Sequence, residues 1–73
     1  MGSQRGEWTV GLGIQVEMAN GLVNSWSEQL SIVGSEDGAR KEAVARLRSR
    51  LATDWPQAHR IEVSVFSSRP AGQ

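Results

Sequence analysis

The sequence predicts an α+β domain of ββαβ order, in which one helix packs on one face of a three-stranded, mostly antiparallel sheet. Three patterns predict this class. Apolar residues occupy alternate positions from residue 8 to 18, an Asn-Gly pair follows at 20–21, and apolar residues at helical spacing lie within 39–53. The 73 residues correspond to one domain. We expect it to span residues 7–67, between a flexible N-terminal lead (1–6) and a flexible C-terminal tail (68–73).

The first predicted strand has the most regular pattern. Its apolar residues fall on successive even positions, which is typical of a strand with one buried face: Trp8, Val10, Leu12, Ile14, Val16 and Met18. Asn20 and Gly21 follow, and this pair favours a two-residue type I′ hairpin in which both residues have positive φ. A second strand should therefore run back antiparallel to the first.

The second predicted strand spans residues 22–33. One face carries Leu22, Trp26, Leu30 and Ile32. The other face carries Ser25, Ser27, Gln29 and Ser31. Because strands rarely exceed about 10 residues, we expect a bulge in this one, near Asn24 or Glu28.

A helix is expected next. Ser35 is a suitable N-cap residue, and Glu36 and Asp37 lie in the first turn, where the helix dipole favours negative charge. The helix should end at Trp55, because Pro56 cannot continue it. Its apolar stripe consists of Ala43, Val44, Leu47 and Leu51.

The third predicted strand spans residues 59–67, with Phe66 on the face opposite Val65. Two strand orders are open, 2-1-3 and 1-2-3. We favour 2-1-3, because the first strand is the most regularly apolar and suits the centre of the sheet. The predicted core is Trp8, Val10, Leu12, Ile14, Val16, Leu22, Trp26, Leu30, Ile32, Ala43, Val44, Leu47, Leu51, Ile61, Val63 and Val65.

Composition excludes several classes of protein. Eight basic residues balance eight acidic ones, and the chain has no Cys and one His. Disulfide bridges are therefore excluded, as is a zinc site with its usual set of about four ligands, and we expect no cofactor and no metal. No apolar run approaches the roughly 20 residues of a membrane span, and no signal region is apparent. We therefore expect a cytoplasmic protein that does not bind membranes.

No catalytic constellation can be assembled from the sequence. Gly11 and Gly13 lie inside a strand, without the third glycine and the helix that a phosphate-binding loop requires. His59 is the only imidazole, and there is no GxSxG nucleophile motif. Glu36 and Asp37 are explained by their place at the start of the helix. We expect a protein without enzymatic activity.

A run of basic residues on the predicted helix is a candidate site for an anion or a nucleic acid: Arg40, Lys41, Arg46, Arg48 and Arg50. At about 100° per residue, Lys41 and Arg48 flank one side of the apolar stripe, and Arg46 and Arg50 flank the other. A solvated helix face is the competing interpretation, since zero net charge is unusual for a protein that binds nucleic acid.

Residues 34–51 contain the segment Arg40-Lys41-Glu42-Ala43, which resembles the opening of the last helix in double-stranded-RNA-binding domains. That family's first helix and third hairpin strand are missing here, and a strand follows the helix instead. The order of hairpin, helix and strand is also similar to the small partial RNase-H-like fold of some antitoxins. This second similarity concerns element order and implies no functional residues.

The size of the chain and the sheet edges point to self-association. A core in so small a domain rarely contributes more than about 3–5 kcal/mol, and oligomerisation is a usual remedy. The second strand has Glu28 as its only charge and no Pro, so as an edge it is poorly protected against pairing. We expect a non-catalytic interaction module that forms a homodimer, or binds a protein partner, through this edge. The candidate edge residues are Val23, Ser25, Ser27, Gln29 and Ser31. The alternative is a nucleic-acid-binding regulatory module that uses the basic residues of the helix.

Overall fold

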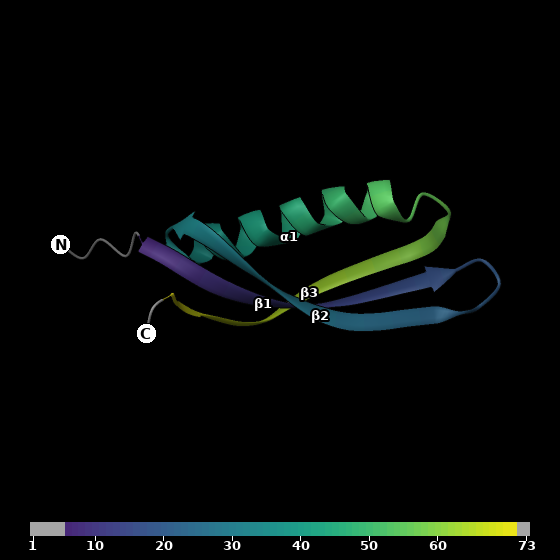
Figure 1. Ribbon diagram of the computed structural model, residues 1–73, viewed down its shortest axis with the longest axis horizontal. Helices are drawn as coiled ribbons and strands as arrows, with labels where there is room; N and C mark the ends of the chain where they lie inside the picture. The colour runs from purple at the N-terminus through teal and green to yellow at the C-terminus, as the bar shows by residue number, and fades with distance from the viewer. Residues whose placement is uncertain (1–5, 72–73) are drawn as a thin grey trace.

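The computed structural model describes residues 6–71. Within them, the elements are β1 (Gly6–Met18), β2 (Val23–Gly34), α1 (Glu36–Asp54) and β3 (Ala58–Pro70). The strands form one antiparallel sheet in the order β2-β1-β3, and α1 lies along one face of this sheet (Figure 1). The predicted ββαβ fold and the predicted strand order are confirmed.

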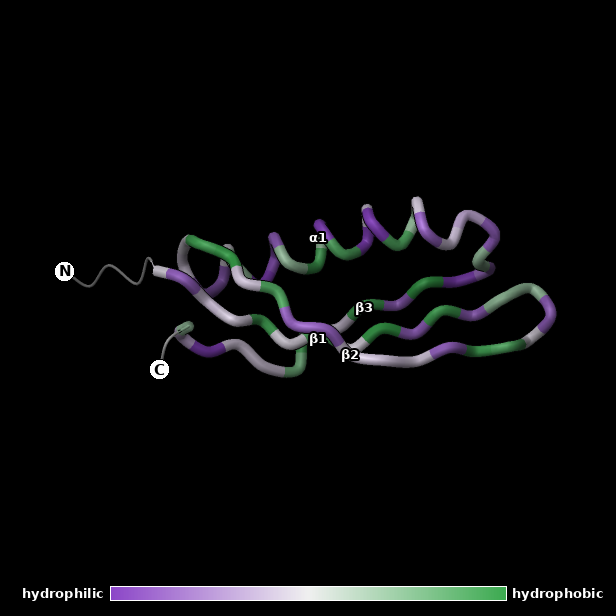
Figure 2. The backbone as a smooth tube through the Cα atoms, viewed as in Figure 1, coloured by the Kyte–Doolittle hydropathy of each residue, from purple (hydrophilic) through white to green (hydrophobic). Residues whose placement is uncertain are grey.

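Alternation along the strands separates an apolar face, covered by α1, from a polar face. Figure 2 shows this alternation as changes of hydropathy along each strand. The buried hydrophobic side chains within residues 6–71 are Val10, Leu12, Ile14, Val16, Ile32, Ala39, Ala43, Leu47 and Leu51. The partly buried side chains packed against them include Trp8, Trp26, Leu30, Val44, Trp55, Ile61, Val63 and Val65.

The predicted core was wrong at Leu22 and omitted Ala39. Leu22 is 64% exposed, because it directly follows the hairpin loop, which reaches past the end of α1 (Figure 1). Ala39 is fully buried and opens a row of inward-facing residues at four-residue spacing along α1. The sheet is therefore covered along the length of α1, while the tip of the hairpin remains exposed.

The bounds of α1 are set by its capping residues, as expected. The Ser35 hydroxyl accepts a hydrogen bond from the Gly38 N–H at 3.1 Å, which satisfies one of the free donors of the first turn. At the other end, the Trp55 N–H donates to the Leu51 carbonyl at 2.8 Å, and Pro56 follows. The helix thus ends where the chain must turn back into β3.

The hairpin between β1 and β2 differs from the predicted type I′ turn. Gly21 has a φ of 91°, and no residue other than glycine within 6–71 has a positive φ, so Asn20 is not left-handed. The Gly21 N–H donates to the Met18 carbonyl at 2.9 Å, and the Met18 N–H donates to the Leu22 carbonyl at 2.8 Å. This is a three-residue loop with a left-handed glycine at its end, and the Asn20 side chain accepts from the Leu22 N–H instead.

The bulge predicted near Asn24 or Glu28 was also wrong, because β2 pairs with β1 in one continuous register. The register shifts lie between β1 and β3 instead. At one of them, Phe66 is the extra residue between Val65 and Ser67. A Cβ atom placed on Gly11 would lie 2.5 Å from the Ser67 hydroxyl and 2.9 Å from the Phe66 ring. Glycine at position 11 therefore leaves the space that these two side chains occupy.

The last strand is longer than predicted and continues past Ser67. β3 continues to Pro70, which lies opposite Trp8, and the Ala71 N–H donates to the Glu7 carbonyl at 2.8 Å. Because that bond turns the backbone groups of Ala71 toward β1, the ring nitrogen of Pro70 faces the free edge, where no donor is needed. Gly6 likewise belongs to β1. The remaining parts of the predicted lead and tail, 1–5 and 72–73, lie outside the described residues.

Candidate interaction edge

β2 is bonded to β1 on one side, and its other side is a free edge of the sheet. The Met18 N–H donates to the Leu22 carbonyl, so even-numbered residues of the hairpin turn their backbone groups toward each other. Odd-numbered residues of β2 therefore turn their N–H and C=O groups toward the free edge. They are Val33, which was not predicted, and the five predicted edge residues, and all six are exposed: Val23, Ser25, Ser27, Gln29, Ser31 and Val33.

The two free edges of the sheet differ in how well they are protected against pairing. β3 carries charged side chains, ends in Pro70 and makes two register shifts against β1. Charges, proline and bulges are the usual means by which an edge strand resists further pairing. β2 has a continuous register, no proline and Glu28 as its one charged residue. The β2 edge is therefore a long and regular template for another strand.

The charge of Glu28 is held on the face of the sheet that α1 covers. The Trp26 indole N–H donates to the Glu28 carboxylate at 2.8 Å, and the Arg50 guanidinium also donates to it. These two hydrogen bonds, with that of Arg50 the stronger cause, hold the pKa of Glu28 below its ordinary value. Arg50 also lies 3.8 Å from Asp54. Sequence reasoning missed this link, because Glu28 and Arg50 are 22 positions apart and neither carries a local signal of pairing.

Next to this link, the rings of Trp26 and Trp55 lie 6.0 Å apart between their centroids. Tilted aromatic pairs at such a distance attract each other. The pair joins β2 to the end of α1. The helix-facing side of β2 is thus fixed to α1 by one aromatic contact and one ion pair, while its outer edge has no such contact within residues 6–71.

The five predicted anion-binding residues are all exposed, but the structure does not gather them into one site. Lys41 pairs with Asp37 at 3.3 Å, Arg46 pairs with Glu42 at 2.8 Å, and Arg50 pairs with Glu28. Arg40 and Arg48 form no ion pair with any residue of 6–71. Arg40 and Lys41 line a groove of about 550 Å³ together with Asp37, Val44 and Val65. Acidic neighbours thus offset most of this basic charge.

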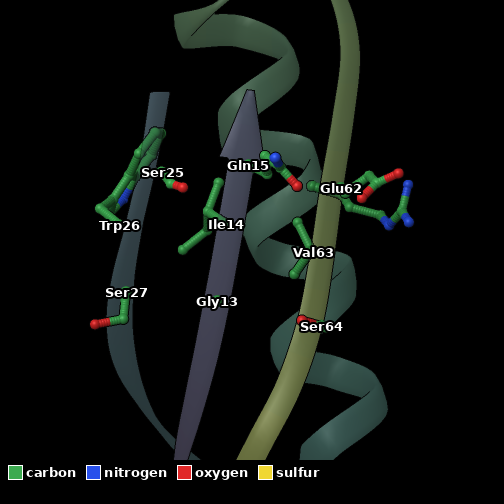
Figure 3. Close-up of a pocket in the computed structure, with 10 residues that line it drawn as sticks. Gly13, Ile14, Gln15, Ser25, Trp26, Ser27, Glu62, Val63 and Ser64 are labelled. Carbon is green, nitrogen blue, oxygen red and sulfur yellow. The ribbon is translucent and has the colours of Figure 1, made fainter. Parts of the chain in front are cut away.

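A second hollow, of about 680 Å³, lies over the middle of the sheet (Figure 3). Gly13 lies opposite Ser27 on one side and Ser64 on the other, so small residues form a row across all three strands. Gln15, Ser25 and Glu62 form the next row, and Arg48 from α1 completes the charged lining. His59, the one candidate imidazole, does not line this hollow. The lining of this hollow thus contains hydroxyl groups, an amide, a carboxylate and a guanidinium group, which suit contact with a polar molecule.

Two classes of site have no counterpart in residues 6–71. No three His, Cys, Asp or Glu side chains lie close enough together to hold a metal ion. No helix in this range is long and apolar enough to cross a bilayer.

Comparison with known proteins found no match: no protein-family model, no curated protein and no solved structure matches the chain.

Proposed function

We propose that this protein is a small, non-catalytic interaction module, and that its partner at the β2 edge is a second copy of the same chain. The observation that carries the proposal is the contrast between the two sheet edges. The outward N–H and C=O groups of β2 form an unbroken row, whereas β3 is bulged, charged and ended by Pro70. Pairing two β2 edges would join two three-stranded sheets into one.

The shape of the chain supports this proposal. Its radius of gyration is 13.9 Å, against about 11 Å for a compact chain of this length. The molecule measures 51 × 18 × 14 Å, so its sheet is long and narrow. Side-by-side pairing of two copies would double the narrow dimension and cover apolar side chains at both ends of β2. Val23 and Val33 are 49% and 75% exposed in the single chain.

The test is the molar mass in solution, measured by size-exclusion chromatography with light scattering over a range of concentrations. The proposal predicts a species of twice 8.0 kDa that dissociates on dilution. A species of 8.0 kDa at high micromolar concentration would refute it. If the mass is that of a monomer but an extended peptide adds to the β2 edge, the protein-partner form of the module is the correct one.

Nucleic-acid binding by the helix is the less favoured function. Its basic residues lie on two sides of α1, and Lys41, Arg46 and Arg50 already have acidic partners. A phosphate backbone would have to compete with these carboxylates.

The proposal of an interaction module also includes a cytoplasmic location, which microscopy of a fluorescently tagged chain would check.

A further inference from the structure

The register of the paired β2 strands can be inferred from their side chains, and this inference rests on the proposed function. In a closed two-fold dimer the strands run antiparallel, and outward-facing residues meet outward-facing residues. One residue near the middle of β2 then lies opposite itself. Centring on Glu28 or Gln29 aligns all but one residue of the strand with its copy, whereas centring on Ser27 leaves more of the strand unpaired.

Apolar side chains distinguish the remaining registers. Centring on Glu28 places Val23 opposite the partner's Val33, on the polar face of the sheet, at both ends of the interface. On the helix-covered face, it places Trp26 opposite the partner's Leu30. Centring on Gln29 would instead place Leu30 opposite the partner's Glu28 and Val33 opposite the partner's Ser25. Apolar cross-strand pairs stabilise a sheet. On the helix-covered face either register gives Trp26 an apolar partner, the partner's Leu30 or the partner's Ile32, so the two Val23–Val33 pairs on the polar face are what favour the Glu28 register.

We propose that two copies pair with Glu28 opposite the partner's Glu28, and that Arg50 of each copy neutralises this pair of carboxylates. Like charges directly opposite each other would otherwise destabilise the pairing. Arg50 already donates to Glu28 within each chain, and Glu28 is further fixed by the Trp26 indole. Two carboxylates and two guanidinium groups thus gather at the two-fold axis. Arg50 thus acts on this interface through Glu28, whose position and charge it controls.

Cysteine pairing tests the register directly, because the natural chain has no Cys. Val23 and the partner's Val33 form a hydrogen-bonded pair with Cα atoms about 5.5 Å apart, within the range a disulfide can bridge. V23C and V33C chains are each oxidised alone and then as a mixture. We expect a disulfide-linked V23C–V33C dimer from the mixture, formed at least ten times faster than a dimer of either variant alone.

Two other mixtures distinguish the competing registers. Faster linkage of V23C with S31C would indicate centring on Ser27, and faster linkage of S25C with V33C would indicate centring on Gln29. Either result, with a dimeric mass by light scattering, would overturn the register and leave the proposed function standing. A monomeric mass would overturn both.

The role of Arg50 is tested by dissociation constants of variants that keep the fold, checked by circular dichroism. R50Q should weaken the dimer at least tenfold, and R50K should restore most of the affinity. R46Q is the matched control, since among residues 6–71 Arg46 pairs with Glu42 on its own helix alone, and it should leave the constant unchanged. E28Q/R50Q should restore pairing, because no like charges remain. An unchanged constant in R50Q would refute the neutralising role.

Discussion

Replacing Ser27 by proline removes one backbone donor from the middle of the β2 edge. The Ser27 N–H faces the free edge, so the substitution breaks no ladder bond within the chain. Proline is tolerated in edge strands for the same reason. We therefore expect Ser27→Pro to keep the fold of the monomer while it impairs pairing with a second copy.

The size of the effect follows from the hydrogen bonds at the interface. In the proposed register Ser27 lies opposite the partner's Gln29, and this pair exchanges two backbone bonds. The proline removes one bond from each of two symmetric pairs. A buried carbonyl without its donor costs about 1–3 kcal/mol, so the dimer should lose about 2–6 kcal/mol. This corresponds to a dissociation constant raised roughly 30-fold to 10⁴-fold.

Sedimentation equilibrium of Ser27→Pro, with Ser27→Ala as the matched control, measures this change. Ser27→Ala keeps the N–H and should dimerise like the natural chain. Circular dichroism should show the same strand and helix content in all three proteins. A Ser27→Pro variant that dimerises with the natural constant would refute edge pairing. Equal weakening by Ser27→Ala would show that the serine side chain, and not the backbone, makes the contact.

Three further predictions concern the core, the Glu28 ion pair and the basic helix. Leu47 is 1% exposed, so Leu47→Ala should lower the free energy of unfolding by about 2–5 kcal/mol in chemical denaturation; a loss below about 1 kcal/mol would contradict the assigned core. Arg50→Gln should raise the pKa of Glu28 toward its ordinary value of 4.5 in a carbon-13 NMR titration. Since folding lowers the pKa of Glu28, the ion pair stabilises the fold at pH values above the ordinary pKa, and this stabilisation is lost as the pH falls through the lowered pKa. The difference in unfolding free energy between the natural chain and Arg50→Gln should therefore shrink in acid. Titration with duplex RNA or DNA should show no salt-sensitive binding. Binding that weakens steeply with salt, and that an Arg46→Ala/Arg50→Ala variant loses, would favour the nucleic-acid function instead.

Local patterns were sufficient to predict the architecture. The unbroken apolar alternation of β1 identified both the buried face and the central strand, because a strand paired on both sides must cover the core along its full length. Ser35 and Pro56 placed α1 to within a residue or two. The free edge of β2 followed from this order, so the candidate edge residues were also predicted from the sequence.

Features that depend on distant residues could not be predicted. The bulge at Phe66 depends on the space left by Gly11, on another strand. The link between Glu28 and Arg50 forms only when α1 is laid over β2. The hairpin was misassigned for a different reason: an Asn-Gly pair suits both a two-residue and a three-residue loop, and the register of the flanking strands selects between them.

Amide hydrogen exchange tests the central claim most directly, because it reports on each N–H of the edge. If two β2 strands pair, the outward amides of Val23, Ser25, Ser27, Gln29 and Ser31 should exchange slowly at concentrations where the dimer forms, and quickly after dilution. The outward amides of Ile61, Val63 and Val65 on the β3 edge are the internal control and should exchange quickly at every concentration. Fast exchange of all the outward β2 amides at millimolar concentration would contradict pairing at this edge.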